Sequence, residues 1–373
     1  MSSITALPAH PRRIAVFRAL NLGDLLCTVP ALRALRQAYP QAWIALVGLE
    51  GARPLVRRFH HYLDALLPFP GDPAFPEQPA RPDELPRFYR RMRNLNFDLV
   101  LQMHGSGMRS NDIAQALGGA CWAGFVPQAS DEQRGRLMAW PDTLPEIERY
   151  LALLTFLGLP ASDASLEFPL SADDRHEAKT VARNAGIDPS RTVFFHPGAR
   201  LESRRWPPER FAAVARALAD DGWQIAITGS KEESALEQDL ARRLARPAAR
   251  LCGATSLGGL AALLKSGRLL ISNDTGVSHV AAATGLRSVI VACGSDVRRW
   301  APLDIERHVV LHHDTPCRPC AYQRCPVGHP CAQGVSVEQV LAQARKQLAQ
   351  GVGSDRASTS RSEDFAGASH EQC

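Results

Sequence analysis

The chain of 373 residues is 45% hydrophobic and 22% charged. This composition allows a substantial buried core and rules out a disordered polyelectrolyte. Its 43 lysines and arginines outnumber its 38 aspartates and glutamates, and the charge of +5 is spread along the chain, which argues against nucleic acid as the main partner. Residues 1–13 lack the apolar core of a secretory signal, and no stretch approaches the ~20 apolar residues of a membrane span. We therefore expect a cytoplasmic protein with two domains.

The first half of the chain repeats a β-branched run, a glycine-containing turn and an amphipathic helix, which is typical of parallel α/β units. Seven prolines between Pro68 and Pro86 predict a long surface loop, which we interpret as a substrate lid. The polar stretch 160–174 follows a predicted helix at 145–157 and marks a domain boundary. The predicted strands of this half are 14–20, 44–47 and 97–103, with a turn at 21–24 and a helix at 25–38.

The second half restarts the same pattern and predicts a second Rossmann-like sheet. We expect a first Rossmann-like domain at 1–170, a second Rossmann-like domain at 171–350 that includes the cysteine-rich segment 317–331, and a disordered tail at 351–373. Two doubly wound domains in tandem are expected to face each other across a ligand-binding cleft. The predicted strands are 192–196, 223–228, 268–272 and 288–293, and the predicted helices are 208–221, 232–244, 257–265, 277–284 and 335–348.

Two turns between a strand and a helix carry the strongest functional signals. Gly23 lets a ligand approach the backbone closely, and Asp24 either faces that ligand or only caps the helix. The run Asn273-Asp274-Thr275-Gly276-Val277-Ser278-His279 predicts a helix start whose free amides bind an anion such as a diphosphate. His279 could donate to the same anion from its ring, and the alternative is a well-capped helix with a packed histidine.

Further polar groups follow other predicted strands. Arg204 and Arg205 stand before a helix and suit phosphate oxygens, although a solvated basic loop is an alternative. Ser230 and Glu233 begin another helix, where the carboxylate could accept hydrogen bonds from a ribose or only complement the helix dipole. His104 follows the strand 97–103 and is a candidate acceptor contact.

Four cysteines in one proline-rich segment have the spacing C-x2-C-x4-C-x5-C. Four thiolates can close a tetrahedral zinc site, and C-x2-C is the usual half of one, although the second pair is irregularly spaced. Free or redox-sensitive thiols and a disulfide pair are the alternatives, and a catalytic role is not expected. The four residues are Cys317, Cys320, Cys325 and Cys331.

Taken together, these motifs resemble glycosyltransferase family 9, whose best-known members are the ADP-heptose:lipopolysaccharide heptosyltransferases. Their order and spacing match over roughly residues 14–350, and N-D-T-G-x-x-H is the most specific element. The cysteine-rich segment is also similar to one in many members. The matching runs are FRALNLGDLLCTVPALRALRQAYPQAWIALV, HPGARLESRRWPPERFAAVARAL, GWQIAITGSKEE and LLISNDTGVSHVAAATGL.

The resemblance implies a two-domain GT-B fold, an inverting mechanism without a divalent metal, and a C-terminal domain that holds the nucleotide sugar. It implies that the N-terminal domain receives the acceptor, with Asp24 as general base, and that Glu233 meets the ribose of a nucleotide sugar. Family members usually carry lysine where this chain has Arg204, which keeps the cation but changes its geometry. The residues that the resemblance places around the diphosphate are Asp274, Thr275, Gly276 and His279.

Two absent motifs agree with this interpretation. The sequence contains no D-x-D, the pattern of transferases that hold the diphosphate through a metal, and no G-x-G-x-x-G after the first strand. We expect ADP-heptose as donor and a lipopolysaccharide-core or other glycan as acceptor, and the charge of +5 would suit a peripheral contact with the inner membrane. The alternatives are a non-catalytic nucleotide-sugar-binding protein and a sugar-nucleotide hydrolase or epimerase on the same fold.

Overall fold

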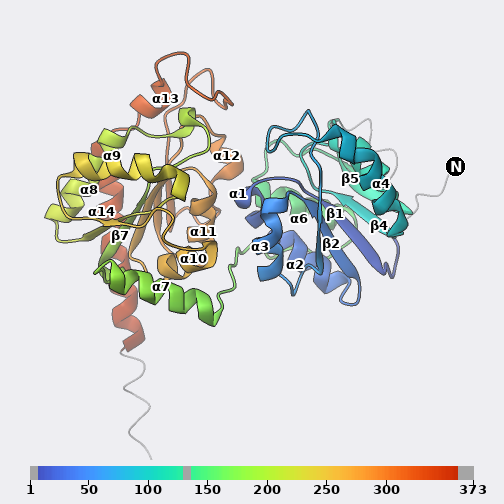
Figure 1. Cartoon of the computed structure of the whole chain (residues 1–373), viewed down its shortest axis with the longest axis horizontal. Helices are drawn as coiled ribbons and strands as arrows, with labels where there is room; N and C mark the ends of the chain where they lie inside the picture. Colours follow the sequence, from blue (N-terminus) through green and yellow to red (C-terminus); the bar gives the residue numbers. More distant parts are fainter. Residues whose placement is uncertain (1–6, 129–135, 360–373) are drawn as a thin grey trace, which may run out of the picture. The chain divides into compact units, whose positions relative to one another are not determined.

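A computed structural model describes residues 7–128 and 136–359, and it divides the chain into two compact units. Unit 1 comprises Met1–Pro169 and unit 2 comprises Leu170–Cys373. Each unit contains one parallel six-stranded sheet with helices packed around it (Figure 1). The predicted α/β class with two Rossmann-like sheets is therefore confirmed.

The sheet of unit 1 has the strand order β3-β2-β1-β4-β5-β6. From β1 the chain builds β2 and β3 toward one edge of the sheet, and it then returns to build β4, β5 and β6 toward the other edge. Because the crossovers are right-handed, this reversal puts helices on both faces of the sheet. The strands are β1 Arg13–Phe17, β2 Trp43–Gly48, β3 Ala65–Pro68, β4 Leu99–Gln102, β5 Cys121–Val126 and β6 Leu137–Ala139. The helices are α1 Leu22–Leu26, α2 Val29–Ala38, α3 Arg53–Arg58, α4 Leu85–Asn94, α5 Ser110–Ala116 and α6 Glu146–Phe156.

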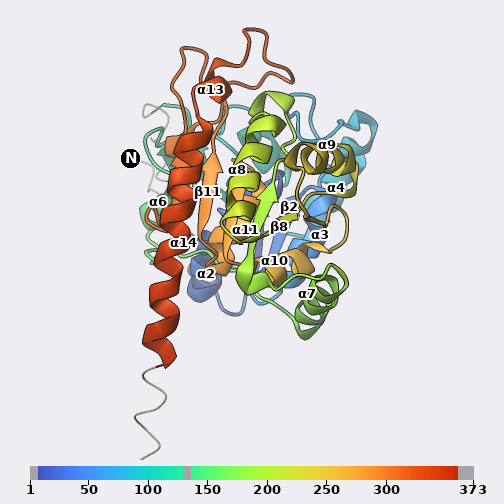
Figure 2. The same ribbon diagram turned by 90° about the vertical axis from the view of Figure 1, so that its left-hand side faces the viewer.

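Unit 2 repeats this topology with the order β12-β11-β10-β7-β8-β9. Helix α14 packs against α8 and β11 (Figure 2), while α10 packs against α7 and α11. The strands are β7 Thr192–His196, β8 Gln224–Ile227, β9 Ala249–Arg250, β10 Leu269–Asn273, β11 Ser288–Val291 and β12 His308–Leu311. The helices are α7 Ala172–Asn184, α8 Pro208–Asp220, α9 Ser234–Leu244, α10 Leu257–Lys265, α11 Gly276–Thr284, α12 Val297–Trp300, α13 Pro330–Gln333 and α14 Val337–Thr359.

Three predictions for element boundaries need correction. The single helix expected at 25–38 is broken into α1 and α2, because Pro30 has no N–H to continue a helix and instead occupies the first turn of α2. The proline-rich segment is not all surface loop, since residues 69–72 are buried and α4 begins at Leu85. Helix α14 continues to Thr359, past the predicted start of the tail, and residues 360–373 lie outside the described part.

Candidate active site

The predicted site residues gather at the switch point of each sheet, where the strand order reverses. In unit 1 this point lies between β1 and β4, and in unit 2 between β7 and β10. Open α/β sheets bind ligands beyond the carboxyl ends of the strands at this position, because the adjacent loops diverge and leave a crevice. The loops after β1 and β4 hold Asp24 and His104, and the loops after β7 and β10 hold Arg204 and Asp274.

Asp24 lies in the first turn of the short helix α1, directly after Gly23. Its Oδ2 accepts a hydrogen bond from the backbone N–H of Asn21 at 3.2 Å, as part of a capping box. The side chain nevertheless remains partly exposed. The capping interpretation is thus correct, and it leaves the carboxylate accessible in a fixed position at the switch point.

Arg18, a residue that the sequence did not single out, anchors the turn that carries Asp24 through hydrogen bonds to its backbone. Arg18 is fully buried, and its guanidinium donates twice to the Asp24 carbonyl, at 2.7 and 3.0 Å, and once to the Met103 carbonyl at 2.7 Å. The same guanidinium pairs with the buried carboxylate of Glu146 at 3.1 Å and contacts the Tyr150 hydroxyl. Arg18 therefore ties the loops after β1 and β4 to helix α6.

The protonation state of this cluster follows from its contacts. Burial alone would lower the pKa of Arg18, but Tyr150, Glu146 and Asp24 outweigh it and raise that pKa, so the cation is kept. Tyr150 also donates to Glu146 at 2.6 Å. The buried guanidinium of Arg18 therefore has hydrogen-bond partners in one carboxylate and two backbone carbonyls, and these bonds fix the loops after β1 and β4 relative to each other.

His104 follows β4 and is only 7% exposed. Its Nδ1 accepts a hydrogen bond from the backbone N–H of Ala19 at 3.2 Å, and its ring stacks on Phe17 and contacts Phe75. Burial, and then the nearby Arg18 charge, lower the pKa of His104 to about 3. The ring is therefore neutral at pH 7 with its proton on Nε2, which is the nitrogen available as a donor.

Asn273, at the end of β10, organises the switch point of unit 2. Its Oδ1 accepts from the backbone N–H of Trp206 at 2.8 Å, and its Nδ2 donates to the Pro197 carbonyl at 2.7 Å. The side chain is fully buried, so both hydrogen bonds are made away from water. The first residue of the N-D-T-G motif thus fixes the loop after β7 against the turn after β10.

The remaining residues of that motif open helix α11. Thr275 is the N-cap residue, and Gly276 is the first helical residue. Asp274 and Thr275 are partly exposed, whereas His279 is only 4% exposed within the helix and lies in electrostatic range of His308. The structure therefore places Asp274, Thr275 and Gly276 at the open edge of the sheet and His279 in a packed position.

Glu233 sits after β8 and is fitted closely against the loop after β7. Its Oε2 accepts from the backbone N–H of Ser230 at 2.8 Å. A Cβ on Gly198 would come within 1.8 Å of Glu233 Oε1, so only glycine leaves room for this carboxylate. Glu233 also lies near the half-buried His196, whose pKa is lowered by desolvation, an effect that the Glu233 charge opposes.

Arg204 and Arg205 both make hydrogen bonds within unit 2. Arg204 Nη2 donates to the Cys320 carbonyl at 3.0 Å, and Arg205 Nε donates to the Ala199 carbonyl at 2.9 Å. The Nε of Arg204 is buried and has no hydrogen-bond partner within the described part of the chain. The two arginines are thus ordered, rather than lying in a solvated basic loop.

The four clustered cysteines are not joined by disulfide bonds, and the structural zinc stays a prediction. Among the residues that the structure describes, no group of three or more histidine, cysteine, aspartate or glutamate side chains is arranged to hold a metal ion. Cys331 is buried, and burial together with Cys320 raises the pKa of its thiol. The disulfide alternative therefore does not apply to Cys317, Cys320, Cys325 and Cys331 in this structure.

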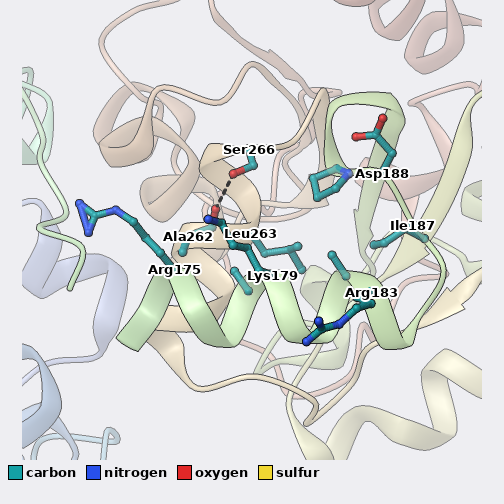
Figure 3. Close-up of a pocket in the computed structure, with 11 residues that line it drawn as sticks. Arg175, Lys179, Arg183, Ile187, Asp188, Ala262, Leu263 and Ser266 are labelled. Atoms are coloured by element: carbon teal, nitrogen blue, oxygen red, sulfur yellow. Dashed lines mark hydrogen bonds between the residues drawn. The ribbon is translucent and has the colours of Figure 1, made fainter. Parts of the chain in front are cut away.

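A cavity of about 440 Å³ lies away from these loops, between α7 and α10 (Figure 3). Apolar side chains that include Ala178, Ala182 and Leu263 line it, with Lys179 and Asp188 among the polar residues. None of the predicted site residues lines this cavity. It therefore does not define the candidate active site, which consists of open loops at the two switch points.

Two Rossmann-like units in tandem, each with polar loops at its switch point, define the GT-B class of glycosyltransferases. Several solved structures share this architecture. The glycosyltransferase family 9 protein from Veillonella parvula DSM 2008 matches with a TM-score of 0.74 at 21% identity, covering 92% of this chain and 99% of that one. The E. coli ADP-heptose LPS heptosyltransferase II matches with a TM-score of 0.67 at 22% identity, covering 91% and 99%.

The sequence comparisons give the family. The model of glycosyltransferase family 9 (heptosyltransferase) matches residues 85–330, which include parts of both units. The chain is 25% identical to lipopolysaccharide heptosyltransferase 1 of Pseudomonas aeruginosa over 84% of this chain and 87% of that protein. It is 26% identical to lipopolysaccharide heptosyltransferase 2 of Escherichia coli K12 over 73% and 80%. The chain belongs to glycosyltransferase family 9.

In the part of the chain that the structure describes, no helix has the length and apolar character needed to cross a membrane.

Proposed function

We propose that this glycosyltransferase moves a heptose from ADP-heptose to a hydroxyl group of a lipopolysaccharide-core acceptor, with inversion at the anomeric carbon and without a metal. The observation that carries the proposal is membership of family 9 together with relatives named as lipopolysaccharide heptosyltransferases. A structure of the E. coli heptosyltransferase WaaC with ADP, similar in fold with a TM-score of 0.60, supports the class of donor.

The two units take different parts in the proposed reaction. Unit 1 binds the acceptor, and Asp24 removes the proton of the attacking hydroxyl. The capping contact to Asn21 and the support from Arg18 favour this role, because they fix the carboxylate without burying it. A positioned general base typically contributes about 10²–10⁴ to the rate. The base never bonds to the sugar, so direct attack by the acceptor inverts the anomeric configuration.

Unit 2 binds the nucleotide sugar in this proposal. Asp274, Thr275 and the amides at the start of α11 surround the diphosphate, and Glu233 accepts hydrogen bonds from the ribose. Arg204 stabilises the negative charge that develops on the departing ADP, for which its buried Nε is a suitable donor. Arg205 and Ser230 shape the surrounding backbone of unit 2, and buried His279 contributes through its ring N–H, whereas Gly23 lies in unit 1 and shapes the turn that carries Asp24. Because cationic and amide groups supply this stabilisation, the mechanism requires no divalent metal.

Incubation with ADP-heptose in the presence and absence of a lipid-linked acceptor tests the proposal. The expected result is ADP release and heptosylated acceptor only when acceptor is present, with EDTA causing no loss. ADP release without acceptor would indicate a hydrolase instead, and binding of ADP-heptose without any ADP release would indicate a non-catalytic binding protein. Either result would refute the proposed transfer.

A further inference from the structure

Helix α4 presents an arginine-rich face to solvent. The helix contains Arg87, Arg90, Arg91 and Arg93, all exposed, and no aspartate or glutamate. At about 100° per residue, the first three of these lie within an arc of roughly 100° on the side opposite Phe88 and Met92. Phe88 and Met92 are buried in the core of unit 1, so the helix is anchored by one face and cationic on the other. We call these four arginines the basic face.

The basic face gathers arginines without ion pairs on one helix. On α9, by contrast, the exposed Arg242 and Arg243 both pair with Asp239 at 2.8 Å. None of the four arginines of the basic face forms a salt bridge within the described residues. Like charges spaced three or four residues apart on a helix destabilise it by a few tenths of a kcal/mol per pair, so the folded monomer gains nothing from this arrangement.

The charge of unit 1 does not explain the basic face either. Residues 1–169 contain 17 arginines, no lysine and 16 acidic residues, for a net charge of only +1. Asp83 and Glu84 precede α4, and Glu84 pairs with Arg81, while Asp72 and Asp112 lie in electrostatic range of Tyr89 on the helix. At the other end Asp98 accepts backbone N–H groups, and the Arg13 guanidinium donates to the Leu95 carbonyl, which extends the cationic surface. Positive charge is therefore concentrated on α4 in a nearly neutral unit.

We propose that the basic face of α4 docks unit 1 on the anionic headgroups of a phospholipid bilayer. The inference rests on the proposed function to the extent that a lipid-linked acceptor resides in such a bilayer. The apolar face of α4 is already buried, so contact is electrostatic and parallel to the surface, without insertion of the helix.

The position of α4 suits this role. Tyr89 of α4 lies in electrostatic range of Asp72 and Arg109, and Arg109 pairs with Asp72 at 3.0 Å. Arg109 belongs to the loop after β4 that also carries His104. The end of unit 1 that is proposed to bind the acceptor thus lies within electrostatic range of the docking helix.

The size of the effect follows from the number of cations. Each arginine near an anionic surface contributes about 1 kcal/mol, equivalent to about a fivefold change in partitioning, so neutralising three of them lowers binding about 100-fold. Because the screening length falls from about 10 Å at 0.1 M salt to about 3 Å at 1 M, the binding is expected to disappear in high salt.

Co-sedimentation of the full chain with vesicles tests the proposal. The vesicles contain phosphatidylcholine with or without phosphatidylglycerol. The docking variant is Arg87→Gln/Arg90→Gln/Arg91→Gln, and the matched control is Arg242→Gln/Arg243→Gln/Arg246→Gln, which removes the same charge from exposed arginines of unit 2. We expect salt-sensitive binding to the anionic vesicles only, a loss of about 100-fold in the docking variant, and a change of less than threefold in the control.

Three outcomes would overturn the inference: wild-type protein that does not bind anionic vesicles, equal losses in both variants, or binding that persists in 1 M salt. Preferential binding of RNA over vesicles through the same arginines would also overturn it. Circular dichroism and the midpoint of thermal unfolding establish that both variants are folded. Vesicle binding is measured without donor, and heptose transfer is measured in the separate assay described above. Transfer by a protein that does not bind vesicles refutes only the docking proposal. Vesicle binding by a protein that does not transfer heptose refutes only the proposed function.

Discussion

The Arg18 cluster allows a quantitative test of how unit 1 holds the turn that carries Asp24. The substitution Arg18→Met retains an apolar side chain of similar length but removes the guanidinium, which bonds two backbone carbonyls and pairs with Glu146. Glu146 is 1% exposed and would lose its closest cation, while it keeps Tyr150 and the more distant Arg149, at 3.6 Å. Breaking a buried pair in this way costs about 3–5 kcal/mol, a large part of a typical stability of about 5–15 kcal/mol.

A double-mutant cycle with Glu146→Gln isolates the interaction. Removing the carboxylate charge relieves the penalty that Arg18→Met creates, so the two substitutions should couple by about 1–3 kcal/mol. The free energy of unfolding of unit 1 can be measured from urea-dependent hydrogen exchange of peptides from β1 and β4, which avoids averaging over two units. The exposed pair of Arg246 and Asp220 provides a control cycle, expected to couple by less than about 1 kcal/mol. A coupling near zero for Arg18 and Glu146 would refute the account of this cluster.

Substitution Gly198→Ala should displace Glu233 and lower the affinity for ADP, measured by calorimetry, about tenfold, as expected for one lost hydrogen bond to a charged group. The control Gly51→Ala adds a Cβ that meets no atom within 4 Å, so ADP binding should be unchanged. Substitution Asn273→Ala removes two buried hydrogen bonds and should destabilise unit 2 by about 2–4 kcal/mol in denaturant unfolding; a smaller loss would mean that the loop after β7 is held by other contacts. His104 has a native pKa of about 3, below its unfolded value, so its contribution is complete above about pH 6.5 and declines as the pH falls. The wild type should therefore lose about 2 kcal/mol more between pH 7 and pH 5 than His104→Gln, and parallel pH profiles would contradict the neutral assignment.

The periodic parts of the fold were predictable from the sequence. The β-branched runs that became β1, β7, β10 and β11 alternate with amphipathic helices, which is enough to define parallel α/β units. The strands β3, β5, β6, β9 and β12 were not predicted; all lie at or near the edges of a sheet, and all but β5 are too short to carry a periodic signal. Helix α4 was missed because the prolines before it drew attention to a loop, although Pro86 in a first helical turn is a favourable position.

The candidate site divides in the same way. Asp24, Glu233 and the N-D-T-G residues were predicted because they follow strands and begin helices, and this local pattern is visible in one sequence. Arg18 was missed because its partners are distant in sequence, with Glu146 more than a hundred residues away. The signal that could have indicated Arg18 is its position directly after the apolar, buried strand β1. The zinc stays a prediction, because spacing alone does not define how four thiols are arranged in space, and no metal-holding group is arranged among the described residues.

The central claim is that Asp24 serves as the base for transfer of a sugar to an acceptor. The direct test is the rate of acceptor heptosylation by Asp24→Asn, with ADP affinity measured in parallel and Asp112→Asn, an exposed aspartate of α5, as the control. We predict a loss of about 10²–10⁴ in turnover with ADP binding nearly unchanged, while the control retains its turnover. An Asp24→Asn variant that keeps most of its turnover would contradict the claim.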